Sequence, residues 1–196
     1  MSPLRQEVER MSEANGDRRR RFDALFASNS SDIVSYCSWR TGSANDAQDA
    51  AAEVFLTAWR RLDDVADGEA GRVWLYATAR KVLANQRRSS RRRAALQERL
   101  TLEVVSAVQD SSSDSEEALV HEALRRLGPH DREVLLLAEW EGLTPAQIAS
   151  VLGCPRVTAR GRLHRARRRF RTAFEELTGK GESGSPRREA SAISMP

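Results

Sequence analysis

The stretch LTPAQIASVLGCPRVTARGRLHRARRRF, from Leu143 to Phe170, contains the strongest local folding signals of the chain. Thr144 suits the cap of a helix, Pro145 suits the first helical position, and Gln147 stands three residues after the cap, which is the pattern of a capping box. Gly153 ends this short helix, and a second helical pattern begins shortly after it. Two helices joined by a tight glycine turn predict a helix-turn-helix.

The second helix of this pair is basic on its free side. Its apolar residues recur every three or four positions, at Ala159, Leu163, Ala166, Phe170, Ala173 and Leu177. Arginines occupy positions 156, 160, 162, 165, 167, 168, 169 and 171, and no acidic residue stands between Gly153 and Phe174. A solvated surface normally mixes both signs of charge, so the pattern favours an external anion over a merely solvated face. DNA phosphates supply such anions when the first turns of the helix enter the major groove.

The composition of the chain divides it into two helical blocks. Apolar residues recur with a helical period throughout, and no sustained strand-like alternation occurs. The stretch DSSSDSEE, residues 110–117, contains only serine and acidic residues, which is typical of a linker. We therefore expect an all-α protein with two small helical domains joined by a flexible linker. The expected boundaries are a disordered N-terminal tail at 1–17, a first domain at 18–93, a linker at 94–117, a second domain at 118–178 and a disordered C-terminal tail at 179–196.

The segment DAQDAAAEVFLTAWRRL, residues 46–62, predicts an amphipathic helix in the first domain. Its apolar stripe consists of Ala51, Phe55, Ala58, Trp59 and Leu62. Three carboxylates, Asp46, Asp49 and Glu53, fall outside the stripe and form an acidic outer face. Taken alone, such a face is more often ordinary solvated surface than a binding site.

The segment RVWLYATARKVLANQRR, residues 72–88, predicts a second helix with two different faces. One face holds Leu75, Ala79, Val82 and Gln86. The other combines an aromatic ring, a hydroxyl, an amide and two cations, at Trp74, Thr78, Lys81, Asn85 and Arg88. Trp74 fits either this functional face or the core, because tryptophan side chains are mostly buried.

Several classes of function find no support in the residues. Cys37 and Cys154 stand far apart without a CxxC pattern, and His121, His130 and His164 are isolated from other candidate ligands or catalytic groups. We therefore expect no metal, no cofactor and no enzymatic activity. The sequence has no apolar run near the roughly 20 residues of a membrane span and no leader of secretory type, so we expect a cytoplasmic protein without membrane insertion. The net charge of +4 favours an anionic partner.

Two ordered segments resemble one known family. ALRRLGPHDREVLLLAEWEGLTPAQIASVLGCPRVTARGRLHRARRRF resembles the fourth conserved region of bacterial sigma factors, and DAQDAAAEVFLTAWRR followed by WLYATARKVLANQRR resembles their second region. With both regions in this order and a short tether between them, the chain resembles the extracytoplasmic-function (ECF) group of the sigma-70 family. The resemblance covers Phe22 to Phe174. It implies a transcription initiation factor that binds core RNA polymerase through the beta and beta-prime subunits and directs it to promoter DNA. An anti-sigma factor is a further candidate partner.

The resemblance also implies roles for individual residues. Region 2 of the family binds polymerase through its acidic helix, and the matching residues here are Asp46, Asp49 and Glu53. The following helix recognises and melts the minus-ten element, and the matching residues are Trp74, Thr78, Lys81, Asn85 and Arg88. The helix-turn-helix of region 4 recognises the minus-35 element, and the matching residues are Arg156, Thr158, Arg160, Arg162 and Arg165. The chain departs from the family pattern at Ala52, where glutamine is usual, and at 157–159, where Gly-Thr-Val is usual.

Two other functions compete with this interpretation. A one-component transcriptional regulator with a helix-turn-helix would need a sensing domain, whereas the first block carries helices with acidic and basic outer faces. An enzyme acting on nucleic acid would need paired carboxylates or metal ligands near the basic faces, and no acidic residue stands between Trp74 and Arg93. The sequence therefore favours the polymerase subunit.

Overall fold

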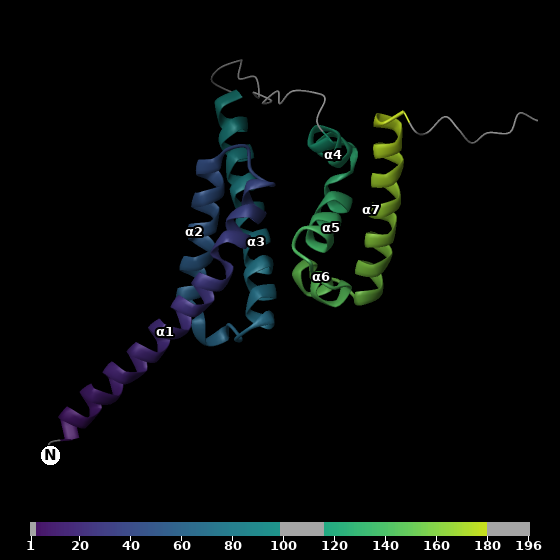
Figure 1. Ribbon diagram of the computed structural model, residues 1–196. Coiled ribbons are helices and arrows are strands. Elements are labelled where there is room, and N and C mark those ends of the chain that lie inside the picture. The colour runs from purple at the N-terminus through teal and green to yellow at the C-terminus, as the bar shows by residue number, and fades with distance from the viewer. Residues whose placement is uncertain (1–2, 99–115, 180–196) are drawn as a thin grey trace, which may run out of the picture.

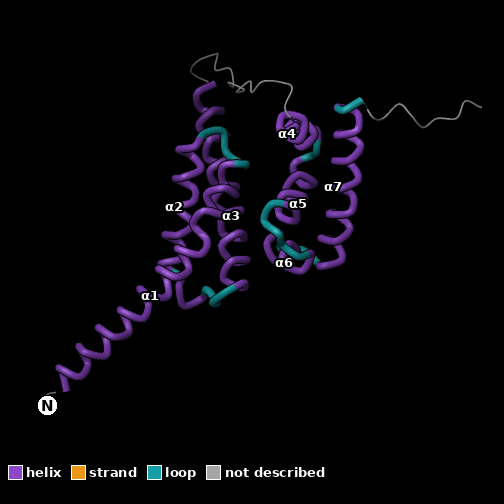
Figure 2. The backbone as a smooth tube through the Cα atoms, viewed as in Figure 1, coloured by secondary structure: helices purple, strands orange, loops and turns teal. Residues whose placement is uncertain are grey.

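The computed structural model describes residues 3–98 and 116–179, which form seven α-helices and one short 3-10 turn (Figures 1 and 2). No strand occurs in these two ranges, so the expected all-α fold is confirmed. The first unit consists of α1 (Pro3–Ser38), α2 (Ala44–Arg60), the turn η1 (Leu62–Asp64) and α3 (Glu69–Glu98). The second unit consists of α4 (Glu116–Arg126), α5 (Pro129–Glu139), α6 (Pro145–Leu152) and α7 (Arg156–Leu177).

The first unit is a bundle in which α1, α2 and α3 all contact one another. The apolar stripe expected for α2 is buried at Ala51, Phe55 and Ala58. The Ser43 hydroxyl accepts a hydrogen bond from the Asp46 backbone nitrogen at 3.1 Å and so caps the start of α2. The buried side chains of α1 and α3 complete the core, at Ile33, Tyr36, Cys37, Leu75, Tyr76, Ala79 and Leu83.

Helix α1 begins much earlier than expected. We expected residues 1–17 to form a disordered tail, but α1 is helical from Pro3 onward and its N-terminal part extends away from the bundle (Figure 1). Proline is well suited to a first helical turn, and the arginine, glutamine and glutamate residues that follow are good helix formers. Helix α3 similarly continues to Glu98, past the expected domain end at residue 93. Most of the expected linker and C-terminal tail, residues 99–115 and 180–196, lie outside the described ranges.

Arginines of α1 hold the chain that connects α2 to α3. Arg18 donates to the Asp63 carboxylate at 2.9 Å and to the Trp59 carbonyl oxygen at 2.7 Å. Arg21 donates to the Asp67 carboxylate at 2.6 Å. These contacts fix the end of α2 and the following turn against α1.

The second unit contains the expected helix-turn-helix. Thr144 and Gln147 form a complete capping box at the start of α6, and Gly153 ends that helix in the left-handed conformation with φ of 62°. Helix α7 packs against α4, α5 and α6, and its buried positions match the expected apolar stripe at Ala159, Leu163, Ala166 and Ala173. The helix-turn-helix expected from these local sequence signals is therefore confirmed, with α6 and α7 as its two helices.

The left-handed turn at Gly153 yields a stability prediction. A Cβ atom at a positive φ is strained, so Gly153→Ala should lower the free energy of unfolding by about 1–2 kcal/mol. Gly161 lies inside α7, where an added Cβ would make only an ordinary contact with Arg165 at 3.5 Å. Gly161→Ala should therefore raise the free energy of unfolding by about 0.5–1 kcal/mol. Urea denaturation of both variants measures the two changes in the free energy of unfolding. Equal changes would contradict the left-handed conformation assigned to Gly153.

Candidate nucleic-acid interface

The arginines of α7 fall into two groups. Arg167 pairs with Glu139 at 2.7 Å and Arg169 pairs with Asp131, so two of the guanidinium groups find carboxylates on α5. Neither arginine has a carboxylate nearby in the sequence, and both partners come from α5, which packs beside this part of α7. Among the described residues, the others have no ion-pair partner: Arg156, Arg160, Arg162, Arg165, Arg168 and Arg171.

The unpaired arginines include all those near the start of α7. Arg156, Arg160 and Arg165 are exposed, whereas Thr158 and Arg162 are half-buried. Val157 beside them is an apolar side chain with 80% of its surface exposed. The first turn of α7 contains no acidic residue, so the helix dipole and the guanidinium charges all favour an anion there. An exposed apolar group among such cations is suited to a base or sugar surface.

The functional face expected on α3 is only partly exposed. Lys81, Asn85 and Arg88 are exposed, but Thr78 is buried and Trp74 is half-buried. Trp74 lies beside Ala146 of α6 around a common apolar depression, because α3 packs against α6 at this level. Thr78 is therefore covered in this structure, whereas Lys81, Asn85 and Arg88 of the same face are open to a ligand.

Asn85 and Arg88 act as a pair on the exposed part of α3. The Arg88 guanidinium donates to the Asn85 side-chain oxygen at 2.7 Å and to the Ala84 carbonyl oxygen at 3.3 Å. The amide nitrogen of Asn85 remains a free donor among the described residues. A guanidinium and an amide held together in this way present donors both to phosphate and to a base edge.

Residues expected to contact two different promoter elements line a single cleft. Its volume is about 760 Å³, and it is lined by Lys81, Asn85 and Arg88 of α3 and by Arg162 of α7. Further cations, Arg40, Arg80 and Arg87, line the same cleft from the first unit. Within the described ranges, neither Arg80 nor Lys81 has a hydrogen-bond or ion-pair partner. The cleft is therefore strongly basic, with Glu133 as its acidic lining residue.

The connection between α2 and α3 offers no free carboxylate at its start. Asp63 and Asp64 are paired with arginines, and Gly71 is buried inside α3. A Cβ atom at Gly71 would lie 2.2 Å from the Ala66 carbonyl oxygen, so only glycine fits there.

The acidic side chains of α2 are exposed, as expected. Asp46, Asp49 and Glu53 lie on the surface without an ion-pair partner in the part of the chain that the structure describes. Leu56, one turn after Glu53, is an apolar side chain that is 42% exposed. The three carboxylates of this face are therefore free to attract a positively charged partner surface.

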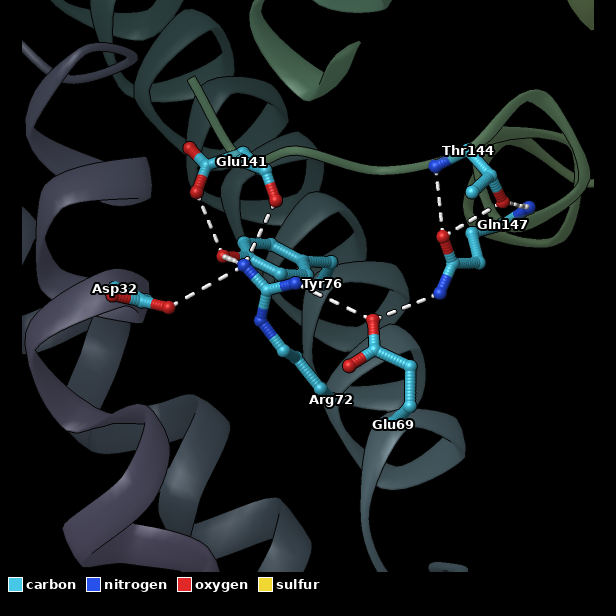
Figure 3. Close-up of polar contacts among 7 residues, drawn as sticks. All are labelled: Asp32, Glu69, Arg72, Tyr76, Glu141, Thr144 and Gln147. Carbon is cyan, nitrogen blue, oxygen red and sulfur yellow. Dashed lines mark hydrogen bonds and ion pairs between the residues drawn. The ribbon is translucent and has the colours of Figure 1, made fainter. Parts of the chain in front are cut away.

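Sequence reasoning missed a polar cluster between the two units. Glu133 and Glu141 of the second unit receive hydrogen bonds from Tyr36 and Tyr76 of the first unit. Figure 3 shows Glu141 facing Arg72 and Tyr76 of α3. No local signal identifies these residues, because glutamate side chains usually face solvent and the two partners lie 97 and 65 positions away.

The described residues contain neither a candidate metal site nor a candidate membrane-spanning helix. No group of three or more histidine, cysteine, aspartate or glutamate side chains there is arranged to hold a metal ion. None of the helices in residues 3–98 and 116–179 combines the length and apolar character needed to cross a membrane.

Comparison with protein families identifies both units. The family described as "Sigma-70 region 2" matches residues 25–93, and the family described as "Sigma-70, region 4" matches residues 117–170. The first match covers the C-terminal part of α1, all of α2 and most of α3, and the second covers nearly all of α4, all of α5 and α6, and most of α7. The order of the two regions is the one expected from the sequence.

Similar proteins and structures agree with this assignment. The chain is 31% identical to "ECF RNA polymerase sigma factor SigL" of Mycobacterium tuberculosis, over 79% of this chain and 89% of that protein. It is 32% identical to "RNA polymerase sigma-H factor" of Pseudomonas aeruginosa, over 83% of this chain and 90% of that protein.

A solved structure shares the fold. The sigma factor RpoE from Bartonella quintana, crystallised with the anti-sigma factor NepR, superposes with a TM-score of 0.63 at 21% identity, over 81% of this chain and 96% of that one. With both family regions matched in order and relatives aligned over most of their length, the chain belongs to the ECF RNA polymerase sigma factors of the sigma-70 family.

Proposed function

We propose that this protein is a transcription initiation factor that binds core RNA polymerase and directs it to specific promoters. The observation that carries the proposal is the basic face of α7 with its unpaired guanidinium groups, on a helix-turn-helix that follows a sigma region 2 in the same chain. The protein acts as a non-enzymatic polymerase subunit in the cytoplasm and needs no cofactor. The relative from Bartonella quintana was solved with an anti-sigma factor, and we extend that kind of partner to this chain.

The helix-turn-helix supplies recognition of the minus-35 element. Arg156, Arg160 and Arg165 are exposed and unpaired near the start of α7, so phosphates and base edges can replace the missing carboxylates. Arg162 and Thr158 are half-buried beside them and are the remaining residues that we assign to the minus-35 element. Boundaries of 18–93 and 118–178 remain our proposal for the two DNA-binding domains.

Region 2 supplies recognition and opening of the minus-ten element. Lys81 and the Asn85–Arg88 pair are exposed on α3 and provide cations for phosphates and an amide for a base edge. Trp74 borders α6, so it can take part only when α6 moves away from α3. Thr78 is buried and can take part only when it becomes exposed. Extruding a base from the duplex costs a few kcal/mol, which contacts of this kind offset.

The acidic face of α2 supplies the contact with polymerase. Asp49 and Glu53 are one turn apart and lie on the surface with Asp46, and each lacks an internal partner among the described residues. A cationic surface on the beta-prime subunit is the complementary partner.

Transcription with purified core RNA polymerase tests the proposal. Core polymerase supplemented with this protein should start at a limited set of defined sites on genomic DNA of the source organism, as mapped from RNA 5′ ends. A one-component regulator would leave core polymerase without defined starts, although it would still bind DNA. Random start sites in the presence of the folded protein would refute the proposal.

The unpaired arginines of α7 give the second functional prediction. Arg160→Ala or Arg162→Ala should weaken promoter use, with a loss of about 1–3 kcal/mol at the base step that each side chain reads. Arg167 provides a matched control, because its charge is already paired with Glu139 at 2.7 Å. Arg167→Ala should have a smaller effect. Start-site use measured at several salt concentrations compares the three variants, and equal losses would remove Arg160 and Arg162 from base recognition.

The acidic face gives the third functional prediction. Asp49→Arg combined with Glu53→Arg should abolish co-purification with core polymerase, since both side chains lie on the surface and their charge would be reversed. Circular dichroism should remain unchanged, because neither side chain contributes to the core. Glu175→Arg with Glu176→Arg makes the same change of charge on exposed positions of α7 and should leave the interaction intact. Normal binding by the α2 variant would exclude this face from the interface.

A further inference from the structure

The basic cleft of about 760 Å³ carries more positive charge than its own carboxylate neutralises. Glu133 is the one acidic residue among its lining residues, against six arginine and lysine side chains, which leaves an excess of five positive charges. A volume of this size is typical of small-molecule sites. The six cationic side chains are Arg40, Arg80, Lys81, Arg87, Arg88 and Arg162.

The carboxylate of Glu133 is already used by donors behind the cleft. The Tyr36 hydroxyl donates to one of its oxygens at 2.6 Å, and the Arg40 guanidinium donates to the other at 2.8 Å. The Arg40 side chain is only 5% exposed, and its second terminal nitrogen is buried without a hydrogen-bond partner in the described part of the chain. Leaving a buried donor without an acceptor is unfavourable. The wall of the cleft therefore has more donors than acceptors.

The other cations of the cleft have spare donors as well. Arg87 donates one terminal nitrogen to the Arg40 backbone oxygen at 2.9 Å, and Arg88 donates one to the Asn85 side-chain oxygen at 2.7 Å. The other terminal nitrogen of each has no partner in residues 3–98 and 116–179. In the same ranges, three cations have no hydrogen-bond or ion-pair partner at all: Arg80, Lys81 and Arg162.

The N-terminal end of α5 adds to the positive potential of the cleft. Pro129 and His130, the first residues of α5, line the cleft, and no side chain caps this helix. The carboxylate of the same turn, Asp131, is paired with Arg169. The partial positive charge at the start of a helix favours a bound anion, and phosphate is the usual one.

Repulsion between cations is already present at this place. Burial lowers the pKa of the Arg132 guanidinium on α5, and the positive charges of Arg125 and Arg87 lower it further. Arg87 is a lining residue of the cleft on α3, so the charge of α3 acts on a cation of α5. A bound anion reduces this repulsion, because opposite charges a few ångströms apart attract each other strongly in a partly buried site.

The lining favours a phosphate chain over an acidic peptide. Five of the six cations are arginines, whose planar guanidinium groups bind phosphate oxygens through parallel donors. They surround one small volume, whereas the carboxylates of a peptide are spaced along its backbone. Leu83, Pro129 and Leu152 add apolar surface to the same cleft, which suits the sugar or base of a nucleotide.

We propose that this cleft binds a small polyphosphate, either a nucleoside triphosphate or an inorganic polyphosphate, whose phosphates pair with Arg80, Lys81, Arg87 and Arg162. Binding requires only residues of this chain. The effect of the ligand on transcription rests on the proposed function, because Lys81 and Arg162 are also among the residues that we assign to promoter DNA. Ligand and promoter therefore compete for these two side chains.

Titration calorimetry of the full chain, without DNA or polymerase, measures the binding. GTP, ATP and inorganic tripolyphosphate are the probes, and guanosine is the control that has a base and a sugar but no phosphate. The three polyphosphates should bind at about 0.15 M salt, and guanosine should not. Tighter binding of the nucleotides than of tripolyphosphate would assign the apolar lining to the base, and equal binding would assign recognition to the phosphate chain. Absence of binding by all three polyphosphates would overturn the proposal.

Charge-matched variants test which arginines bind the ligand. Arg80→Ala with Arg87→Ala should weaken binding about tenfold or more, because each change removes a charge-assisted hydrogen bond to phosphate. Arg168→Ala with Arg171→Ala makes the same change in net charge at exposed positions of α7 that do not line the cleft. This control should keep nearly the affinity of the unaltered chain. Equal losses by the two folded variants would overturn the proposal.

Cys154 reports the place of binding in the unaltered chain. It is half-buried and lines the cleft, whereas burial raises the pKa of the Cys37 thiol to about 11 and keeps that cysteine unreactive at neutral pH. Saturating tripolyphosphate should slow the alkylation of Cys154 by uncharged iodoacetamide several-fold, as measured by mass spectrometry.

A control cysteine on the exposed part of α7, Thr172→Cys in a chain with Cys154→Ala, should react at the same rate with and without the ligand. An unchanged rate at Cys154 under saturating ligand would overturn the assignment of the cleft. None of these measurements depends on transcription, so failure of promoter-directed initiation would be recognised separately.

Discussion

The pairing of arginine side chains with carboxylates and carbonyl oxygens determines which helices of this protein are held together. Lys81 and Lys180 are its only lysines, so nearly all positive charge sits on guanidinium groups, which stay protonated and bind carboxylates or phosphates through several donors. Several arginines that reach a carboxylate or carbonyl oxygen of another element fix the two elements together. Arg18 does this between α1 and the turn after α2, and Arg169 does it between α7 and α5. Where none is available, the guanidinium remains for an external anion.

The same division applies to the carboxylates. Glu133 and Glu141 accept hydrogen bonds that join the two units. Asp49 and Glu53, by contrast, lie on the surface without partners among the described residues. The surfaces we assign to DNA and to polymerase are thus the places where charge has been left uncompensated. At the junction between the units, by contrast, the buried charges are paired with hydrogen-bond donors.

Sequence alone determined the secondary structure and the identity of both regions. The capping box at Thr144, the glycine turn at Gly153 and the stripe along α7 are local signals, and each depends on residues within a few positions of one another. The acidic face of α2 and the exposed part of the α3 face followed from helical period in the same way. Local patterns could not show that residues 3–17 join α1, because the segment has helix formers but no apolar stripe comparable to that of α2.

Only the tertiary structure decided which charges are paired and which surfaces are covered. Arg167 and Arg169 look identical in sequence to the unpaired arginines beside them, and they differ only because α5 places Glu139 and Asp131 next to them. Thr78 shares a helical face with Lys81 and Asn85, yet it is buried while they are exposed. The contacts of Tyr36 with Glu133 and of Tyr76 with Glu141 join residues 97 and 65 positions apart. Helical period is a local property of the chain, whereas burial and charge pairing depend on neighbours that folding brings from distant positions.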